Sequence, residues 1–93
     1  MMANITIENK SDSKLIFSSF NKGDGGSGAP LDHKWVDAHG SDTLNAGDFD
    51  CLGIGVQIQS GGVWIGGDPK DGPYITAGGK FTFSITKQVS KEC

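Results

Sequence analysis

The chain contains no arginine, and this absence narrows the classes of ligand that it can hold. Arginine supplies the planar guanidinium fork that recognises carboxylates and phosphates through paired hydrogen bonds. The eight basic residues are all lysines, and they are dispersed along a chain whose formal net charge is −3. Because nucleic-acid backbones are held by clustered basic side chains, we predict that nucleic acid is not a partner.

Long hydrophobic runs are also missing. Residues 1–5 include no basic region followed by an apolar run, so no secretory signal is predicted. No stretch approaches the roughly 18 consecutive apolar residues of a membrane-spanning helix. We therefore expect a protein without a transmembrane segment, which is cytoplasmic or is released without a classical signal peptide.

Cysteine is scarce, with Cys51 and Cys93 as the two examples. Their separation matches no motif for metal binding or redox chemistry. A chain without a secretory signal is expected in a reducing compartment, where thiols stay reduced. We predict two free thiols, and the alternative is a disulfide that holds the C-terminus.

Glycine is the residue that the chain has in plenty, at 15 of 93 residues, while apolar residues make up 35%. This profile is typical of a strand-and-turn protein rather than a helical bundle. The length predicts a single domain over residues 1–93. Residues 21–30 hold four glycines and almost no apolar side chains. We predict a mobile loop there, because such a segment cannot order itself by burial.

Alternation of apolar and polar residues predicts strands. It is visible at residues 3–8 and 81–85, and the apolar opening of residues 15–20 predicts a further strand. At residues 54–59 it leads into a Ser-Gly-Gly turn and the apolar segment 63–65, which predicts a hairpin. Turn signals recur about every 8–15 residues, which is the spacing of all-β domains. The predicted fold is a single antiparallel β-sandwich or small barrel of about six to eight short strands.

No catalytic or metal-binding motif is present. His33 and His39 lie six positions apart, which matches no standard metal-ligand spacing. Cys51 with either histidine could imitate a thiol nucleophile and its base, but no local signature surrounds it. We predict that the chain is not an enzyme, has no catalytic residues and needs no organic cofactor.

Aspartates in glycine-rich turns raise one metal hypothesis. Calcium takes several carboxylate and carbonyl oxygens, and loops of this kind can supply both. The spacing does not fit an EF-hand, and the alternative is that these residues form turns and keep the surface soluble. The candidate calcium ligands are Asp48, Asp50, Asp68 and Asp71.

Aromatic and amide side chains near turns give the best candidates for a binding site. Trp35, Trp64 and Tyr74 each lie close to a polar or glycine-rich turn. Such rings can stack on sugars or lie at a lipid headgroup boundary, and the alternative is that they pack in the core. Gln57 and Gln59 could bond sugar hydroxyls, or could simply solvate a sheet.

Residues 5–11, Leu15 and residues 44–47 carry a likeness to a known family. The strand ending in Asn-Lys-Ser and the Leu-Asn-Ala-Gly turn before an aromatic strand resemble the start of the aegerolysins. They also resemble related cytolysin-like proteins. The aegerolysins are small β-sandwich proteins that interact with membrane lipids and help to form pores. The likeness covers roughly the first half of the chain. It implies a lipid-binding role, and no family binding residue is transferred to this sequence.

These observations predict a non-enzymatic, lectin-like recognition protein with a defence or toxin role. It would bind glycans or membrane lipids through aromatic and polar residues at loop edges. A second hypothesis is a structural protein that self-assembles into homo-oligomers through exposed strand edges. A third is a protease inhibitor that presents residues 21–30.

Overall fold

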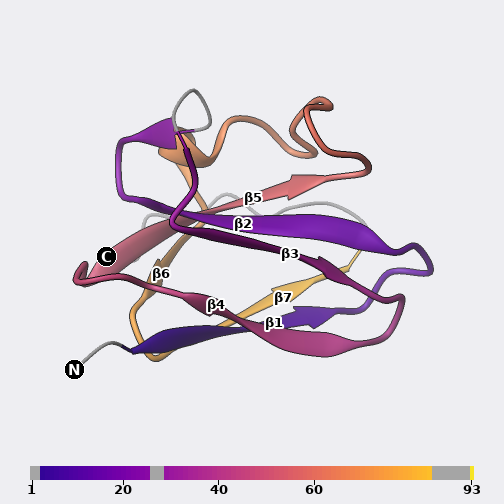
Figure 1. Cartoon of the computed structure of the whole chain (residues 1–93), viewed down its shortest axis with the longest axis horizontal. Coiled ribbons are helices and arrows are strands. Elements are labelled where there is room, and N and C mark those ends of the chain that lie inside the picture. The colour runs from indigo at the N-terminus through magenta and orange to yellow at the C-terminus, as the bar shows by residue number, and fades with distance from the viewer. Residues whose placement is uncertain (1–2, 26–28, 85–92) are drawn as a thin grey trace.

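The computed structural model describes residues 3–25, 29–84 and 93. The described part of the chain forms seven strands in two sheets and very little helix (Figure 1). The first sheet has the order β4 (Ser41–Asn45), β1 (Asn4–Asn9), β7 (Lys80–Phe83). The second has the order β3 (Asp32–Val36), β2 (Leu15–Asn21), β5 (Cys51–Gln57), β6 (Tyr74–Thr76). A short 3-10 helix, η2 (Pro69–Asp71), precedes β6.

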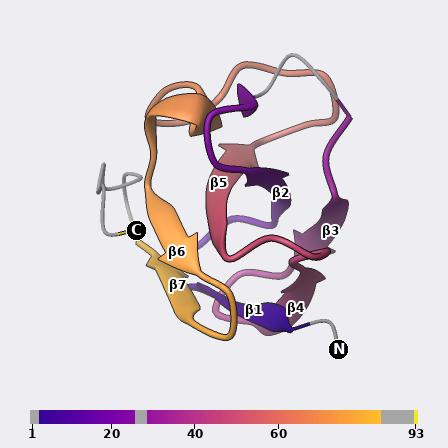
Figure 2. The same cartoon turned by 90° about the vertical axis from the view of Figure 1, so that its left-hand side faces the viewer.

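The all-β class is confirmed for the described residues, and neither sheet closes into a barrel. The prediction that the sheets are antiparallel throughout is wrong at one pair, because β7 runs parallel to β1. The other described strand pairs are antiparallel. Alternation within a strand shows which face is buried, but it does not show the direction of the neighbour. Here β7 arrives from β6 in the opposite sheet, so no hairpin with β1 sets its direction (Figure 2).

The hydrophobic core lies between the two sheets, which Figure 2 shows stacked. Phe17 of β2 meets Phe81 and Phe83 of β7 edge-on, with ring centroids 6.4 and 6.0 Å apart. Each strand contributes alternate residues, as its two-residue period requires. The buried cluster contains Ile5, Ile7, Leu15, Phe17, Val36, Leu44, Ala46, Leu52, Ile54, Val56, Ile75, Phe81 and Phe83.

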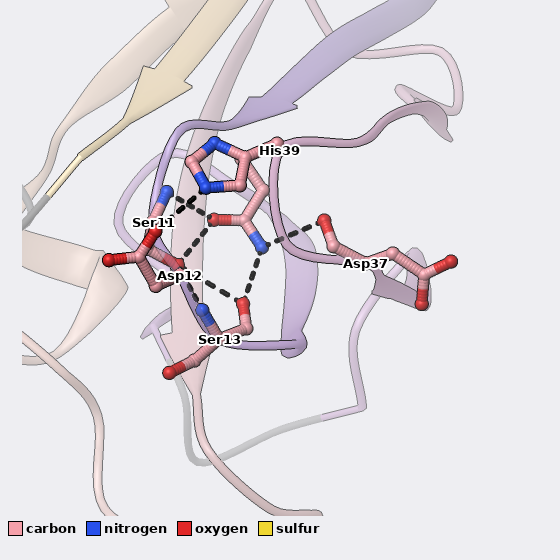
Figure 3. A network of polar contacts seen from close by, with 6 residues as sticks. Ser11, Asp12, Ser13, Asp37 and His39 are labelled. Carbon is pink, nitrogen blue, oxygen red and sulfur yellow. Dashed lines mark hydrogen bonds and ion pairs between the residues drawn. The ribbon is translucent and has the colours of Figure 1, made fainter.

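One end of the fold is held by the buried side chain of Asn9, the last residue of β1. Its Oδ1 accepts hydrogen bonds from the backbone N–H and the hydroxyl of Ser11, at 3.0 and 2.7 Å. Figure 3 shows the two turns that meet here, with the His39 ring and an Asp12 carboxylate oxygen 2.7 Å apart. The Asn9 Nδ2 donates to the carbonyls of Ser13, Val36 and Asp37, at 2.8, 3.1 and 3.2 Å. These hydrogen bonds therefore connect the β1–β2 turn to the β3–β4 turn.

Cys51 and Cys93 form a disulfide, so the prediction of two free thiols is wrong. Cys51 begins β5, and the last residue of the chain lies beside it with a Cα–Cα separation of 5.8 Å. That separation is usual for a disulfide. The two positions are 42 residues apart in sequence, and spacing along a chain does not report proximity across a sheet.

One prediction changes in the segment that follows β5. The second arm of the predicted hairpin, residues 63–65, is not a strand. Its Ile65 N–H donates a backbone hydrogen bond to the Val56 carbonyl of β5, at 2.8 Å. Residues 26–28 of the predicted mobile loop lie outside the described residues, as does Ile85 at the end of the last predicted strand.

Candidate functional site

The outer face of β2 is covered, although a two-layer fold would leave it open to solvent. Phe17 and its alternate neighbours face the core, so Ile16, Ser18 and Phe20 project from the other side of the strand. All three are nevertheless buried. The residues between β5 and β6 provide part of this cover, because they fold back over the outer face of the four-stranded sheet.

Glycines on β5 allow that close approach. The ring of Trp64 lies directly against Gly55, where a Cβ atom would stand 2.7 Å from the Trp64 Cε3. In the same way Pro69 lies against Gly53, where a Cβ would stand 3.3 Å from its carbonyl carbon. The Trp64 ring also meets Phe20 edge-on, with centroids 5.7 Å apart. Trp64 is therefore held in place by its contacts with β2 and β5.

Between Trp64 and the edge strand β3 the outer face forms a hollow of about 230 Å³, named here the outer-face hollow. Polar side chains reach it from three adjacent strands, with Ser18 on β2, His33 on β3 and Gln57 on β5. Ser18 is directly opposite His33 in the strand register. The complete lining is Ile16, Ser18, Phe20, Pro30, His33, Gln57, Ser60, Gly61 and Trp64.

The polar groups of the hollow have unused hydrogen-bonding capacity. The Gln57 Nε2 donates to the Gly62 carbonyl at 2.8 Å, and this leaves its Oε1 as an acceptor. Ser18 is 3% exposed, and its hydroxyl forms no side-chain hydrogen bond with another described residue. In the described part of the chain, every fully buried polar side-chain atom has a partner. Ser18 is one of the residues that line the hollow.

Two of the other predicted binding residues lie on the surface outside the hollow. Trp35 is 49% exposed and lies on the same face of β3 as His33, opposite Ile16 in the register. The Lys14 ammonium is 5.8 Å from the centroid of its ring. Gln59 is exposed in the loop after β5. The structure thus brings Trp64 and Gln57 together and leaves Trp35 and Gln59 at the margin.

Tyr74 is buried on β6, away from the hollow. Its hydroxyl donates a hydrogen bond to the Lys70 carbonyl. The Lys22 ammonium lies 4.9 Å from the centroid of its ring. Both the ring and the hydroxyl therefore have partners within the chain.

The aspartates of the calcium hypothesis lie in two separate turns. Asp48 and Asp50 belong to the β4–β5 turn, whereas Asp68 and Asp71 lie at the two ends of η2. The Asp68 carboxylate accepts from the Lys70 backbone N–H at 2.9 Å, so it caps the short helix. Among residues 3–25, 29–84 and 93, no group of three or more His, Cys, Asp or Glu side chains could hold a metal ion. The calcium hypothesis has no support here.

The sequence does not indicate Ser18 as a ligand contact, and it raises His33 only as a metal ligand or a catalytic base. The signal that could have indicated Ser18 is the run from Leu15 to Phe20, which has apolar residues on both faces of one strand. A run of this kind is typical of a strand buried on both sides. It indicates that something covers the outer face, and polar residues within it are then candidates for a site.

A second surface feature is the loop at residues 58–63. Ile58 and Val63 are 65% and 84% exposed, and the loop contains no charged residue. A hydrogen bond from the Gly62 N–H to the Gln59 carbonyl, at 3.0 Å, closes the turn between them. The two side chains form the apolar tip of this loop.

No family model matches this chain. No curated protein and no solved structure matches it either. The resemblance of the first half to the aegerolysins stays a prediction. Within the described ranges, no helix has the length and apolar character needed to cross a bilayer.

Proposed function

We propose that this chain is a β-sandwich recognition protein that binds a saccharide in the outer-face hollow and does not act on it chemically. The observation that carries the proposal is the meeting of the Trp64 ring with Ser18, His33 and Gln57 around one hollow. Sugar rings present apolar C–H faces and polar hydroxyl edges. An aromatic ring beside hydrogen-bonding groups complements both.

The size of the hollow favours a small ligand unit. Pockets for drug-sized molecules hold about 300–1,000 Å³, whereas this hollow has about 230 Å³. It would hold one sugar ring, either free or at the end of a longer glycan. Trp35 lies further along the same strand face as His33, where a second unit could reach it.

Binding is favoured over catalysis by the relation between Ser18 and His33. Catalysis by a serine nucleophile needs a histidine base that accepts a hydrogen bond from its hydroxyl. The two residues are opposite each other, but no hydrogen bond joins their side chains. We therefore propose the Ser18 hydroxyl as a ligand contact rather than as a nucleophile.

A glycan array followed by titration tests the proposal. His33→Ala removes an exposed side chain from the hollow and is expected to weaken binding about tenfold, the effect of one lost hydrogen bond. Thr43→Ala is the matched control, because Thr43 is exposed on β4 in the other sheet. Absence of binding to every glycan at millimolar concentration would count against the proposal, as would equal effects of the two variants.

A second candidate function is contact with a lipid surface through the apolar tip. The exposure of Ile58 and Val63 on an uncharged loop favours it, because apolar side chains of this kind can enter the headgroup region. Vesicle sedimentation with the wild type and with a V63D variant tests this function. Equal sedimentation of the two proteins, or none for the wild type, would refute it.

We also propose that the protein works in an oxidising environment, in line with release from the cell. The disulfide between Cys51 and Cys93 supports this localisation, because disulfides persist in oxidising compartments and are rare in the cytosol. Thiol labelling of the protein isolated from its natural source is expected to detect no free cysteine. Full labelling of both cysteines would contradict the proposal.

A further inference from the structure

We infer that the outer-face hollow selects a neutral sugar unit and that Ser18 is the specificity-determining contact with one of its hydroxyls. This inference rests on the proposed function and names the chemistry of the same site. Three observations support it: the charge of the lining, the position of the buried Ser18 hydroxyl beside Gln57, and the fixed position of Trp64.

The lining has no fixed charge. None of the residues around the hollow is an aspartate, a glutamate or a lysine, and the chain has no arginine. His33 is the one titratable side chain of this lining, and with its ring neutral a carboxylate, sulfate or phosphate group placed there would lose water without gaining a counter-charge. Desolvation without a partner strongly disfavours an ion. The hollow therefore discriminates against acidic sugars and favours neutral ones.

The floor of the hollow offers a matched pair of polar atoms. Ser18 is opposite Gly55 and Gln57 is opposite Ile16, so Ser18 and Gln57 are diagonal neighbours on adjacent strands. Residues in this relation lie about 7–8 Å apart, and their Cβ atoms are somewhat closer. Two hydrogen bonds of about 2.8 Å to adjacent hydroxyls of one ring span such a gap. The Ser18 hydroxyl can donate and accept, while the Gln57 Oε1 accepts.

The apolar wall is already in place before a ligand arrives. Gly55 and Phe20 hold the Trp64 ring from two directions. The Gln57 Nε2 bond to the Gly62 carbonyl ties the same loop to the sheet. A preformed wall reduces the ordering cost of binding. Selection then depends on the polar contacts, of which Ser18 is the most deeply buried.

The experiment uses the full chain with its disulfide intact and follows amide chemical shifts during titration. The neutral probes are the methyl glycosides of glucose, galactose, mannose and N-acetylglucosamine. The acidic probes are glucuronic acid and N-acetylneuraminic acid. At least one neutral probe is expected to bind, with an affinity at least tenfold higher than that of either acid.

The adjacent serine gives a matched control for Ser18. Ser19 lies on the opposite face, and its hydroxyl donates to the Asn45 carbonyl at 2.9 Å. Ser18→Ala is expected to weaken binding of the neutral probe about tenfold while leaving the melting temperature unchanged, because the hydroxyl has no hydrogen-bond partner among the described residues. Ser19→Ala is expected to lower the melting temperature and to leave the affinity unchanged.

The outcomes separate the inference from the function on which it rests. If acidic and neutral sugars bind equally, or if Ser18→Ala binds as tightly as the wild type, the inference is overturned and saccharide binding stands. If no sugar in either group shifts the hollow residues, the proposed function and this inference fail together.

Discussion

Replacing Gly55 by alanine tests how Trp64 is held against the sheet. The φ angle of Gly55 lies outside the left-handed region, so the backbone accepts alanine. The added Cβ would lie 2.7 Å from the Trp64 Cε3, a separation that forces the ring to move. Overpacking of this kind costs about 1–3 kcal/mol. Loss of the edge-on contact with Phe20 adds about 0.5–1.5 kcal/mol. We therefore expect Gly55→Ala to lower the free energy of unfolding by about 2–4 kcal/mol.

The sign of the effect is expected to change when Trp64 is absent. In a Trp64→Ala background the Cβ meets no ring, and alanine is favoured over glycine in a strand by about 0.5–1 kcal/mol. Gly55→Ala should then be neutral or stabilising. Gly53→Ala is the control, because its Cβ would meet Pro69 rather than Trp64 and its cost should not depend on the Trp64 substitution.

Urea denaturation followed by circular dichroism measures the four free energies of this double-mutant cycle. The expected coupling between Gly55 and Trp64 is about 2–5 kcal/mol. An equal cost of Gly55→Ala in both backgrounds would refute the packing that we describe, and so would a Gly53 control that is rescued to the same extent.

Three further perturbations have defined outcomes. Converting Cys51 and Cys93 to serine should lower the unfolding free energy by about 4 kcal/mol, from loop-closure entropy over a separation of 42 residues, as measured in urea; an unchanged midpoint would contradict this. Asn9→Ala removes the hydrogen bonds of a buried side chain and should lower the unfolding free energy by about 2–4 kcal/mol in the same assay. A decrease below about 0.5 kcal/mol would contradict a stabilising role for these hydrogen bonds. The hydrogen bond from the Thr43 backbone N–H and the positive charge of Lys34 lower the pKa of Asp42 below its usual value. A lowered folded-state pKa stabilises the fold above the unfolded value and loses that effect as pH falls through the folded one. The difference in urea midpoint between wild type and Asp42→Asn should therefore be present at about pH 6 and absent at about pH 2, and a constant difference would be inconsistent with this linkage.

Much of the fold could be predicted from local patterns. The alternation of Ile5 with Ile7 and of Phe81 with Phe83 correctly indicates which side of each strand is buried. The parallel pairing of β1 with β7 could not be predicted in this way. It depends on which sheet the chain enters after β6, and this is decided by packing between distant segments rather than by residues near either strand.

The site was predictable only in part, for a related reason. The sequence indicates Trp64 because it lies near a glycine-rich turn and Gln57 because its amide can bond sugar hydroxyls, and both line the hollow. Ser18 and His33 reach it because β2 and β3 pair in one particular register. Gly55 lets the Trp64 ring lie against β5, a role that the alternation of residues 54–59 does not indicate. Such roles depend on contacts between segments that no single stretch of sequence contains.

Intermolecular nuclear Overhauser effects between a bound sugar and the protein give the most direct test of the central claim. We expect contacts from the C–H protons of a neutral sugar ring to the Trp64 indole, together with amide shifts at Ser18, His33 and Gln57. Residues of the β4–β1–β7 sheet should not change. Contacts confined to the apolar tip at residues 58–63, or no contacts at saturating sugar, would contradict binding in the outer-face hollow.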